Sequence, residues 1–183
     1  MKTTSEHLIS DLIERSRKNL NAAEKMKTYS LEQLNRKPAS ESWSALEAIE
    51  HLNRYGDFYL PEIANRISGS KSISEVHFKA GFLGDYFAKM MLPGEKSGKM
   101  KTFKDKDPSG SKLDRSCLDR FIQQQKRILQ LLDKARIVSL NKTKTSISIT
   151  PLLKLKLGDT FRVVIYHNER HVLQAQKALM PAS

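Results

Sequence analysis

Cysteine is almost absent from this chain, which has only Cys117 among its 183 residues. A single cysteine cannot form a disulfide within the chain, so a small fold held together by disulfides is excluded. The chain also lacks the roughly 20 consecutive apolar residues of a membrane span and the basic, then apolar, opening of a secretion signal. We therefore expect a soluble protein of the cytoplasm, where thiols stay reduced.

Aromatic residues make up only 7% of the chain. Acidic residues are also few, since the chain has 20 acidic and 32 basic residues and a formal net charge of +12. Such a charge attracts nucleic acid, an acidic partner or an anionic small molecule. The densest basic run, Lys96 to Lys106, contains one aromatic residue, Phe103, where a groove for single strands uses several stacking rings. We therefore interpret the Lys-rich segment 93–112 as a solvated loop, and nucleic acid is not the expected partner.

Apolar residues that recur at helical spacing predict four long helices, at about 4–26, 44–67, 113–135 and 159–180. The stretch SALE at residues 44–47 has the form of a capping box, which marks the start of the second helix. At 183 residues the chain can bury one core without disulfides. These features predict an all-α fold, a four-helix bundle with decorated loops, in a single domain of residues 1–183.

Shorter elements are expected between the long helices. YSLEQLNRKP predicts a helical turn that stops before Pro38, and FLGDYFAKMML predicts a short helix. KTKTSISIT could be a strand or an extended linker, and Thr150 with Pro151 is expected to start a helical turn. Asp159 is expected to cap the last long helix, and Pro61 is expected to kink the second one.

The sequence HNERH at residues 167–171 places two histidines four apart near the end of the last helix. A helix turns about 100° per residue, so His167 and His171 lie about 40° apart, at the border between the apolar stripe and the polar face. The same count on the second helix puts His51 at the same border. If these two helices pack side by side, the three histidines meet in one cleft.

The helical count also assigns residues to the solvent-facing sides. On the last helix it predicts that Tyr166, Glu169 and Arg170 face water. On the second helix it predicts the same for Glu50 and Arg54. These five residues are therefore expected outside the core.

Three interpretations of the histidines are open: metal ligands, acid–base groups, or polar residues of a surface helix. Two histidines at i and i+4 with a third from a facing helix can hold one divalent ion and leave a position open for water. HNERH is not the HExxH motif of zinc proteases, because its glutamate comes at a different position. Glu47, one turn before His51, could take a proton, although the capping box already explains it.

Two longer stretches carry a family resemblance. SWSALEAIEHL at 42–52 together with YHNERHVLQAQ at 166–176 resembles the DinB/YfiT-like family of metal-dependent enzymes. The resemblance implies a four-helix bundle of unusual connectivity, often dimeric, with a divalent metal, commonly nickel or zinc, held by three histidines. That ligand pattern falls on His51, His167 and His171.

The resemblance also bears on function. Relatives include S-transferases and isomerases that use the thiols bacillithiol or mycothiol, and many members are described as hydrolases. It therefore implies a metal-dependent hydrolase or thiol-dependent S-transferase that acts on a small molecule, with a homodimer as the expected assembly. Arg170 matches an arginine that often follows this pattern, where it would anchor substrate or pair on the helix surface, and Trp43 is expected to pack beneath the loop before the second helix.

One alternative belongs to a different class of protein. The chain could be a non-enzymatic basic module with vestigial histidines that binds an acidic protein or nucleic acid. The residues expected to form its binding face are Lys96 to Lys106, Lys142, Lys144, Lys154 and Lys156.

Overall fold

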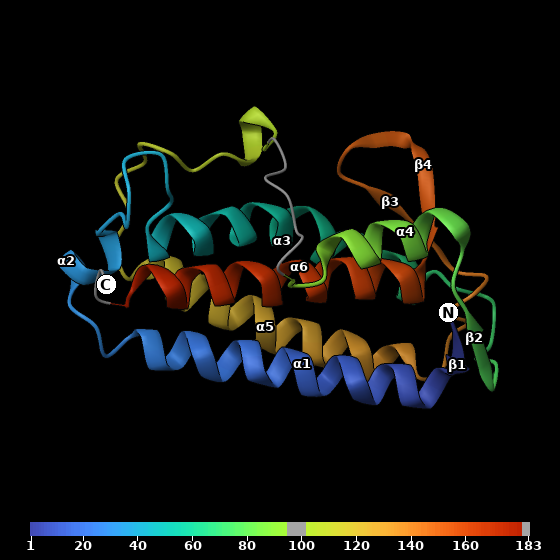
Figure 1. Ribbon diagram of the computed structural model, residues 1–183. Helices are drawn as coiled ribbons and strands as arrows, with labels where there is room; N and C mark the ends of the chain where they lie inside the picture. The colour runs from blue at the N-terminus through green and yellow to red at the C-terminus, as the bar shows by residue number, and fades with distance from the viewer. Residues whose placement is uncertain (95–101, 181–183) are drawn as a thin grey trace.

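The computed structural model describes residues 1–94 and 102–180, and most of these residues are helical (Figure 1). The described residues form six α-helices: α1 Ser5–Met26, α2 Leu31–Asn35, α3 Ala45–Ser68, α4 Phe82–Met91, α5 Ser116–Ala135 and α6 Leu157–Ala178. The four long helices lie where the apolar spacing predicts them, and both short helices are also present. No helix in these described ranges is long and apolar enough to cross a membrane.

The starts of the long helices follow from local hydrogen bonding. The hydroxyl of Ser44 accepts from the backbone N–H of Glu47, and the Glu47 carboxylate accepts from the backbone N–H of Ser44, which confirms the predicted capping box. The cap predicted for α6 is wrong, because α6 begins at Leu157 and Asp159 is buried within its first turn. The helix α3 continues through Pro61, and the kink expected there stays a prediction.

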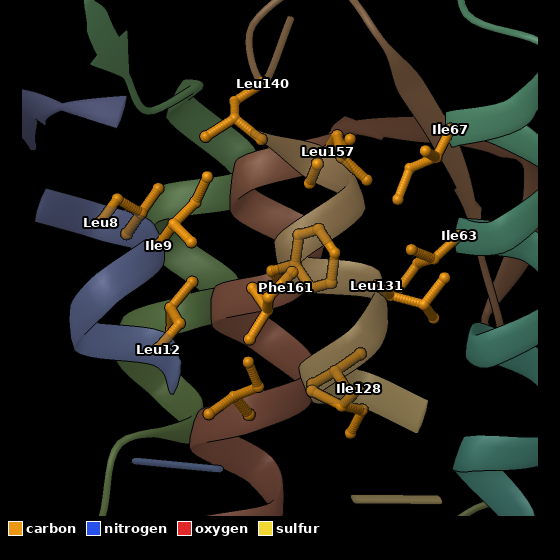
Figure 2. Close-up of a cluster of buried hydrophobic side chains, with 14 of the residues drawn as sticks. Leu8, Ile9, Leu12, Ile63, Ile67, Ile128, Leu131, Leu140, Leu157 and Phe161 are labelled. Carbon is orange, nitrogen blue, oxygen red and sulfur yellow. The ribbon is translucent and has the colours of Figure 1, made fainter. Parts of the chain in front are cut away.

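The four long helices pack side by side, with α1 and α3 each in contact with both α5 and α6 (Figure 1). Their apolar stripes bury two clusters of side chains. Figure 2 shows the cluster at the strand-bearing end, to which all four helices contribute, for example through Leu12, Ile63, Leu131 and Phe161. The second cluster lies at the other end, where α2 covers it with Leu34.

The fold is mostly helical as predicted, and short strands accompany the helices; one of them, at residues 144–147, is the strand that KTKTSISIT left open. The described residues include two antiparallel two-stranded sheets: β1 Lys2–Thr4 with β2 His77–Lys79, and β3 Lys144–Ile147 with β4 Thr150–Lys156. The helical turn predicted at residue 150 is therefore a strand. A strand forms here because alternate residues turn to one face of the hairpin, where Thr145 and its cross-strand partner Leu155 are both buried.

The short helix α4 packs along α6 and is drawn close to it by Gly84. A Cβ atom at Gly84 would lie only 2.4 Å from the Cγ atom of Asp159 on α6. The absence of a side chain therefore lets the two helix backbones approach. This close packing places α4 as one wall of a pocket described below.

Candidate metal centre

The three predicted histidines meet at the junction of the two apolar clusters. On α6 the first cluster ends at Tyr166 and the second begins at Val172, so the HNERH turn lies between them. His51 comes from α3, whose packing against α6 brings it to the same level. The ring centroids are 5.0 Å apart for His51 and His167 and 4.6 Å apart for each of the other two pairs.

Hydrogen bonds fix which nitrogen of each ring faces the centre. Nδ1 of His51 lies 2.8 Å from the carbonyl oxygen of Lys106, and Nδ1 of His171 lies 2.7 Å from Oε1 of Gln174. Because both partners are oxygens that accept, each Nδ1 donates its proton and each Nε2 keeps a free lone pair. Such an outer partner is what orients a metal-binding histidine.

Burial keeps all three rings uncharged at neutral pH. Desolvation is the main cause that lowers the pKa of His51 to about 4 and that of His171 to about 3. Desolvation, followed by the proximity of the other two histidines, also lowers the pKa of His167 well below its ordinary value. Neutral imidazole is the form that binds a metal ion, so no proton has to leave before an ion can enter.

The spacing of the nitrogens fits a small divalent ion. Nε2 of His51 lies 3.2 Å from Nε2 of His167, and one ring nitrogen from each of the three histidines falls within 4.8 Å of the others. Tetrahedral ligands at 2.0–2.1 Å from an ion are about 3.3 Å from one another. Among the described histidine, cysteine and acidic side chains, these three histidines form a group that could hold a metal ion.

Two aromatic rings enclose the histidines. Trp43 lies 4.7 Å from the ring of His51 and 5.8 Å from that of His171, and its indole N–H donates to Ser109 at 3.1 Å. Tyr55 lies edge-on to His51 and His167, and burial raises its pKa to about 12. Trp43 therefore packs against the histidines themselves, closer to the site than its predicted place beneath a loop.

The described part of the Lys-rich segment, residues 102–112, is bound to α3 and is not a freely solvated loop. Arg54 donates to the backbone carbonyl of Asp107 at 2.7 Å and to the hydroxyl of Ser111 at 3.2 Å. The backbone N–H of Gly110 donates to Glu47 at 3.4 Å. The remainder of the predicted loop, residues 95–101, lies outside the described residues.

A pocket opens beside the histidines, between α4 and the β3–β4 hairpin. Its volume is about 130 Å³, and a cavity of roughly 150 Å³ can hold a benzene molecule. Apolar side chains from α4, α6 and the hairpin form most of its wall, among them Phe87, Met91, Ile147, Leu155 and Val163. The pocket therefore suits a small molecule with an apolar part.

The other predicted site residues lie at different distances from this pocket. Arg170 lines it and donates to the carbonyl oxygen of Met90 at 3.2 Å. Glu47 is engaged elsewhere, because its carboxylate caps α3 and also contacts Lys37 at 3.0 Å. Glu169 points toward α1, where its carboxylate pairs with Arg15 at 2.7 Å.

Two assignments from the helical count are wrong, because neighbouring helices cover positions that the count leaves open. Tyr166 is buried, with the guanidinium of Arg162 over its ring. Glu50 is buried as well, and it pairs with Arg54 and Arg120.

The remaining histidines and the cysteine lie away from the three-histidine group. His7 and His77 are exposed on the surface. Cys117 is buried, and desolvation raises the pKa of its thiol, which lowers the share of the reactive thiolate form.

Sequence reasoning missed two partners of the histidine rings, the carbonyl of Lys106 and the amide of Gln174. Only Gln174 leaves a signal in the sequence, since it follows His171 by three residues, the spacing of neighbours on a helix surface. A backbone carbonyl that arrives from a loop has no such signature.

The fold is a mostly helical scaffold that brings together three histidines of α3 and α6, a group that could hold a metal ion. A sequence profile of the DinB superfamily matches residues 12–175, so this chain belongs to that superfamily and the resemblance is confirmed. The comparisons with curated proteins and with solved structures each return no significant match.

Proposed function

We propose that this protein is a metal-dependent enzyme built on a four-helix bundle of the DinB type, in which His51, His167 and His171 hold one divalent ion. The observation that supports the proposal most directly is the inward orientation of neutral imidazoles whose Nδ1 atoms are already engaged. Three imidazoles suit nickel or zinc among the divalent ions. A bound ion of this kind would supply a Lewis acid for a substrate oxygen, water or thiol.

The residues around the ion suggest how a substrate is held. Tyr55 lines the pocket and stays protonated because burial raises its pKa to about 12, so its phenol can donate a hydrogen bond. Arg170, also on the pocket wall, can hold an anionic group. The apolar remainder of the wall excludes water from a small organic substrate.

Hydrolysis and thiol-dependent group transfer both fit this arrangement. In the second case a low-molecular-weight thiol would be a co-substrate, since Cys117 is buried and its pKa is raised. A catalytic proton acceptor is not assigned to Glu47, whose carboxylate oxygens are engaged by the helix cap, Lys37 and Gly110. A homodimer belongs to this proposal as the common state of DinB relatives.

Metal analysis of protein purified without a histidine tag tests the ligand set. Wild-type protein is expected to bind about one equivalent of nickel or zinc, and His51→Ala and His171→Ala less than about a tenth, because loss of one of three ligands removes much of the affinity. The matched control is His77→Ala, which removes an exposed histidine on β2. Full metal content in both ligand variants would refute the assignment.

A further inference from the structure

Both walls of the pocket, α4 and the β3–β4 hairpin, also expose large apolar side chains on the face turned away from the pocket. On α4, Phe87 and Met91 line the pocket, whereas Phe82 and Tyr86 point outward. Phe82 is 91% exposed, and it lies one helical turn before Tyr86, so the two rings share one outer face of the helix. Tyr86 contacts the ring of Phe87, whereas almost the whole of Phe82 is open to solvent.

The β3–β4 hairpin repeats this arrangement. Its inner face, formed by Thr145, Ile147 and Leu155, is buried against the helices. Residues that pair across strands share a face, so the outer face carries the cross-strand pair Lys144 and Lys156 and continues through Lys154 to Leu152. Leu152 is 89% exposed at the end of this face.

The lysines on this outer face lack neutralising partners. Within residues 1–94 and 102–180, no carboxylate lies within 4.0 Å of Lys144 or Lys154. Lys144 also lies directly across from Lys156, a pairing of like charges that destabilises a hairpin unless an anion is near. The Nζ atom of Lys156 turns away to donate to the carbonyl oxygen of Lys79.

We propose that this rim surface, formed by Phe82, Tyr86, Lys144, Leu152 and Lys154, docks on an anionic membrane leaflet. Exposed apolar side chains next to lysines are what peripheral proteins insert between lipid head groups, while the lysines are attracted by the negative surface potential. The lysine face of the hairpin adjoins the start of α4, because the Lys156 side chain reaches over it: its Nζ donates to the carbonyl oxygen of Lys79, and its Cε atom would lie 3.8 Å from a Cβ atom at Gly81, the residue before Phe82.

The charge of this surface favours an anionic leaflet over a second copy of the chain, and its apolar side chains favour a leaflet over a nucleic acid. A second copy of the chain seated on this surface would bring the same lysines against each other across a two-fold interface, and their mutual repulsion would oppose that contact. A nucleic acid would neutralise the lysines and leave Leu152 and Phe82 without an apolar environment. An anionic leaflet satisfies the lysines and the apolar side chains together.

Co-sedimentation with lipid vesicles tests the proposal on the full chain. Wild-type protein is expected to bind vesicles of phosphatidylcholine with about 30% phosphatidylserine and not vesicles of phosphatidylcholine alone. The double variant Lys144→Glu with Lys154→Glu is expected to lower the partition coefficient at least about tenfold, because each reversal replaces attraction by repulsion. Leu152→Ser is expected to lower it about fivefold at unchanged charge.

The matched control is Lys126→Glu with Lys134→Glu, which makes the same change in net charge on α5. Both lysines are exposed, and α5 does not form the pocket rim (Figure 1). We expect the control to change the partition coefficient less than about twofold. An equal loss in the control, or no binding of the wild-type protein to anionic vesicles, would overturn the proposal.

Two further measurements test the other occupants of this surface, a second copy of the chain and a nucleic acid. Sedimentation equilibrium without lipid would overturn the proposal if the protein is a dimer that Leu152→Ser dissociates. Binding of duplex DNA that depends on Lys144 and Lys154, without vesicle binding, would overturn it as well. Metal content is expected to stay at the wild-type level in all these variants, so failure of the docking surface is distinguishable from failure of the metal centre.

Discussion

Two buried clusters of ionisable groups lie on the same helix, α6, and they differ in how their groups are partnered. Near the start of α6, Arg162 donates to Asp159 at 3.0 Å and to Asp85 at 2.8 Å, and Asp159 also accepts from the backbone N–H of Gly81. Further along α6, the inward Nε2 lone pairs of the histidine cluster face one another. The first cluster is closed by opposite charges, and the second is open.

This difference separates a cluster whose charges are paired within the protein from one that could still hold an ion. In the Arg162 cluster each charge is balanced within the protein, so nothing further has to bind. In the histidine cluster, ring nitrogens of three uncharged side chains lie within 4.8 Å of one another, which is a group that could hold a metal ion. Burial of polar groups alone therefore does not mark a site, whereas convergence of groups of one kind does.

Arg162→Leu is the change that should break the closed cluster. It leaves the buried carboxylate of Asp159 without its charged partner, and we expect the free energy of unfolding to fall by about 3–5 kcal/mol. Urea denaturation measures this loss. The control Arg66→Leu removes an arginine from a more exposed pair with Glu62 and should cost less than about 1 kcal/mol. Similar losses in both variants would contradict the role given to the buried ions.

Gln174→Leu should weaken the open cluster without unfolding it. The variant removes the acceptor for Nδ1 of His171, and we expect the affinity for zinc to fall by about 10- to 100-fold. Competition with a chromophoric chelator measures the affinity. The control is Gln176→Leu, on a different face of α6, since two residues turn a helix by about 200°. An unchanged affinity in the Gln174 variant would show that the amide does not orient the ring.

Asp85→Asn should have the smallest effect and the clearest dependence on pH. Hydrogen bonds from Lys89, and then from Arg162, lower the pKa of Asp85 to about 2 in the folded protein. A lowered pKa stabilises the fold above the ordinary value of about 3.9, and this contribution is lost as the pH falls toward the folded value.

We therefore expect Asp85→Asn to cost about 1 kcal/mol at pH 6 and almost nothing near pH 2. Urea denaturation at a series of pH values tests this. The control Asp119→Asn changes an exposed carboxylate paired with Lys27 and should cost less than about 0.5 kcal/mol throughout. A constant loss at all pH values for the Asp85 variant would argue for a steric cause.

The helices were predictable from the sequence because local rules govern them. The capping box at Ser44 and the apolar spacing of α5 each depend on residues close together in the chain. The strands β1 and β2 were not predicted, because their pairing joins residues 2–4 to residues 77–79 and each strand is short. The role of Asp159 was missed for a similar reason, since the backbone N–H of Gly81 that donates to it lies on a distant segment.

The metal centre was predictable in part. Counting directions on two helices selected His51, His167 and His171, and the structure brings these three together. The count could not show that Glu50 and Tyr166 are buried, because a helical wheel describes one helix and burial depends on its neighbours. The count also could not predict the hydrogen-bond partners of the rings. One is a backbone carbonyl in a loop, and the other depends on the conformation of the Gln174 side chain.

The contact between His51 and residue 106 is made to a backbone carbonyl, so the identity of the side chain at 106 does not matter to it. Point substitutions there would leave the acceptor in place. Changes in the length of the segment between Asp107 and Ser111, which Arg54 holds at both ends, would move it. Among relatives of this protein, insertions and deletions in that segment are therefore expected to tune the centre more strongly than amino-acid replacements do.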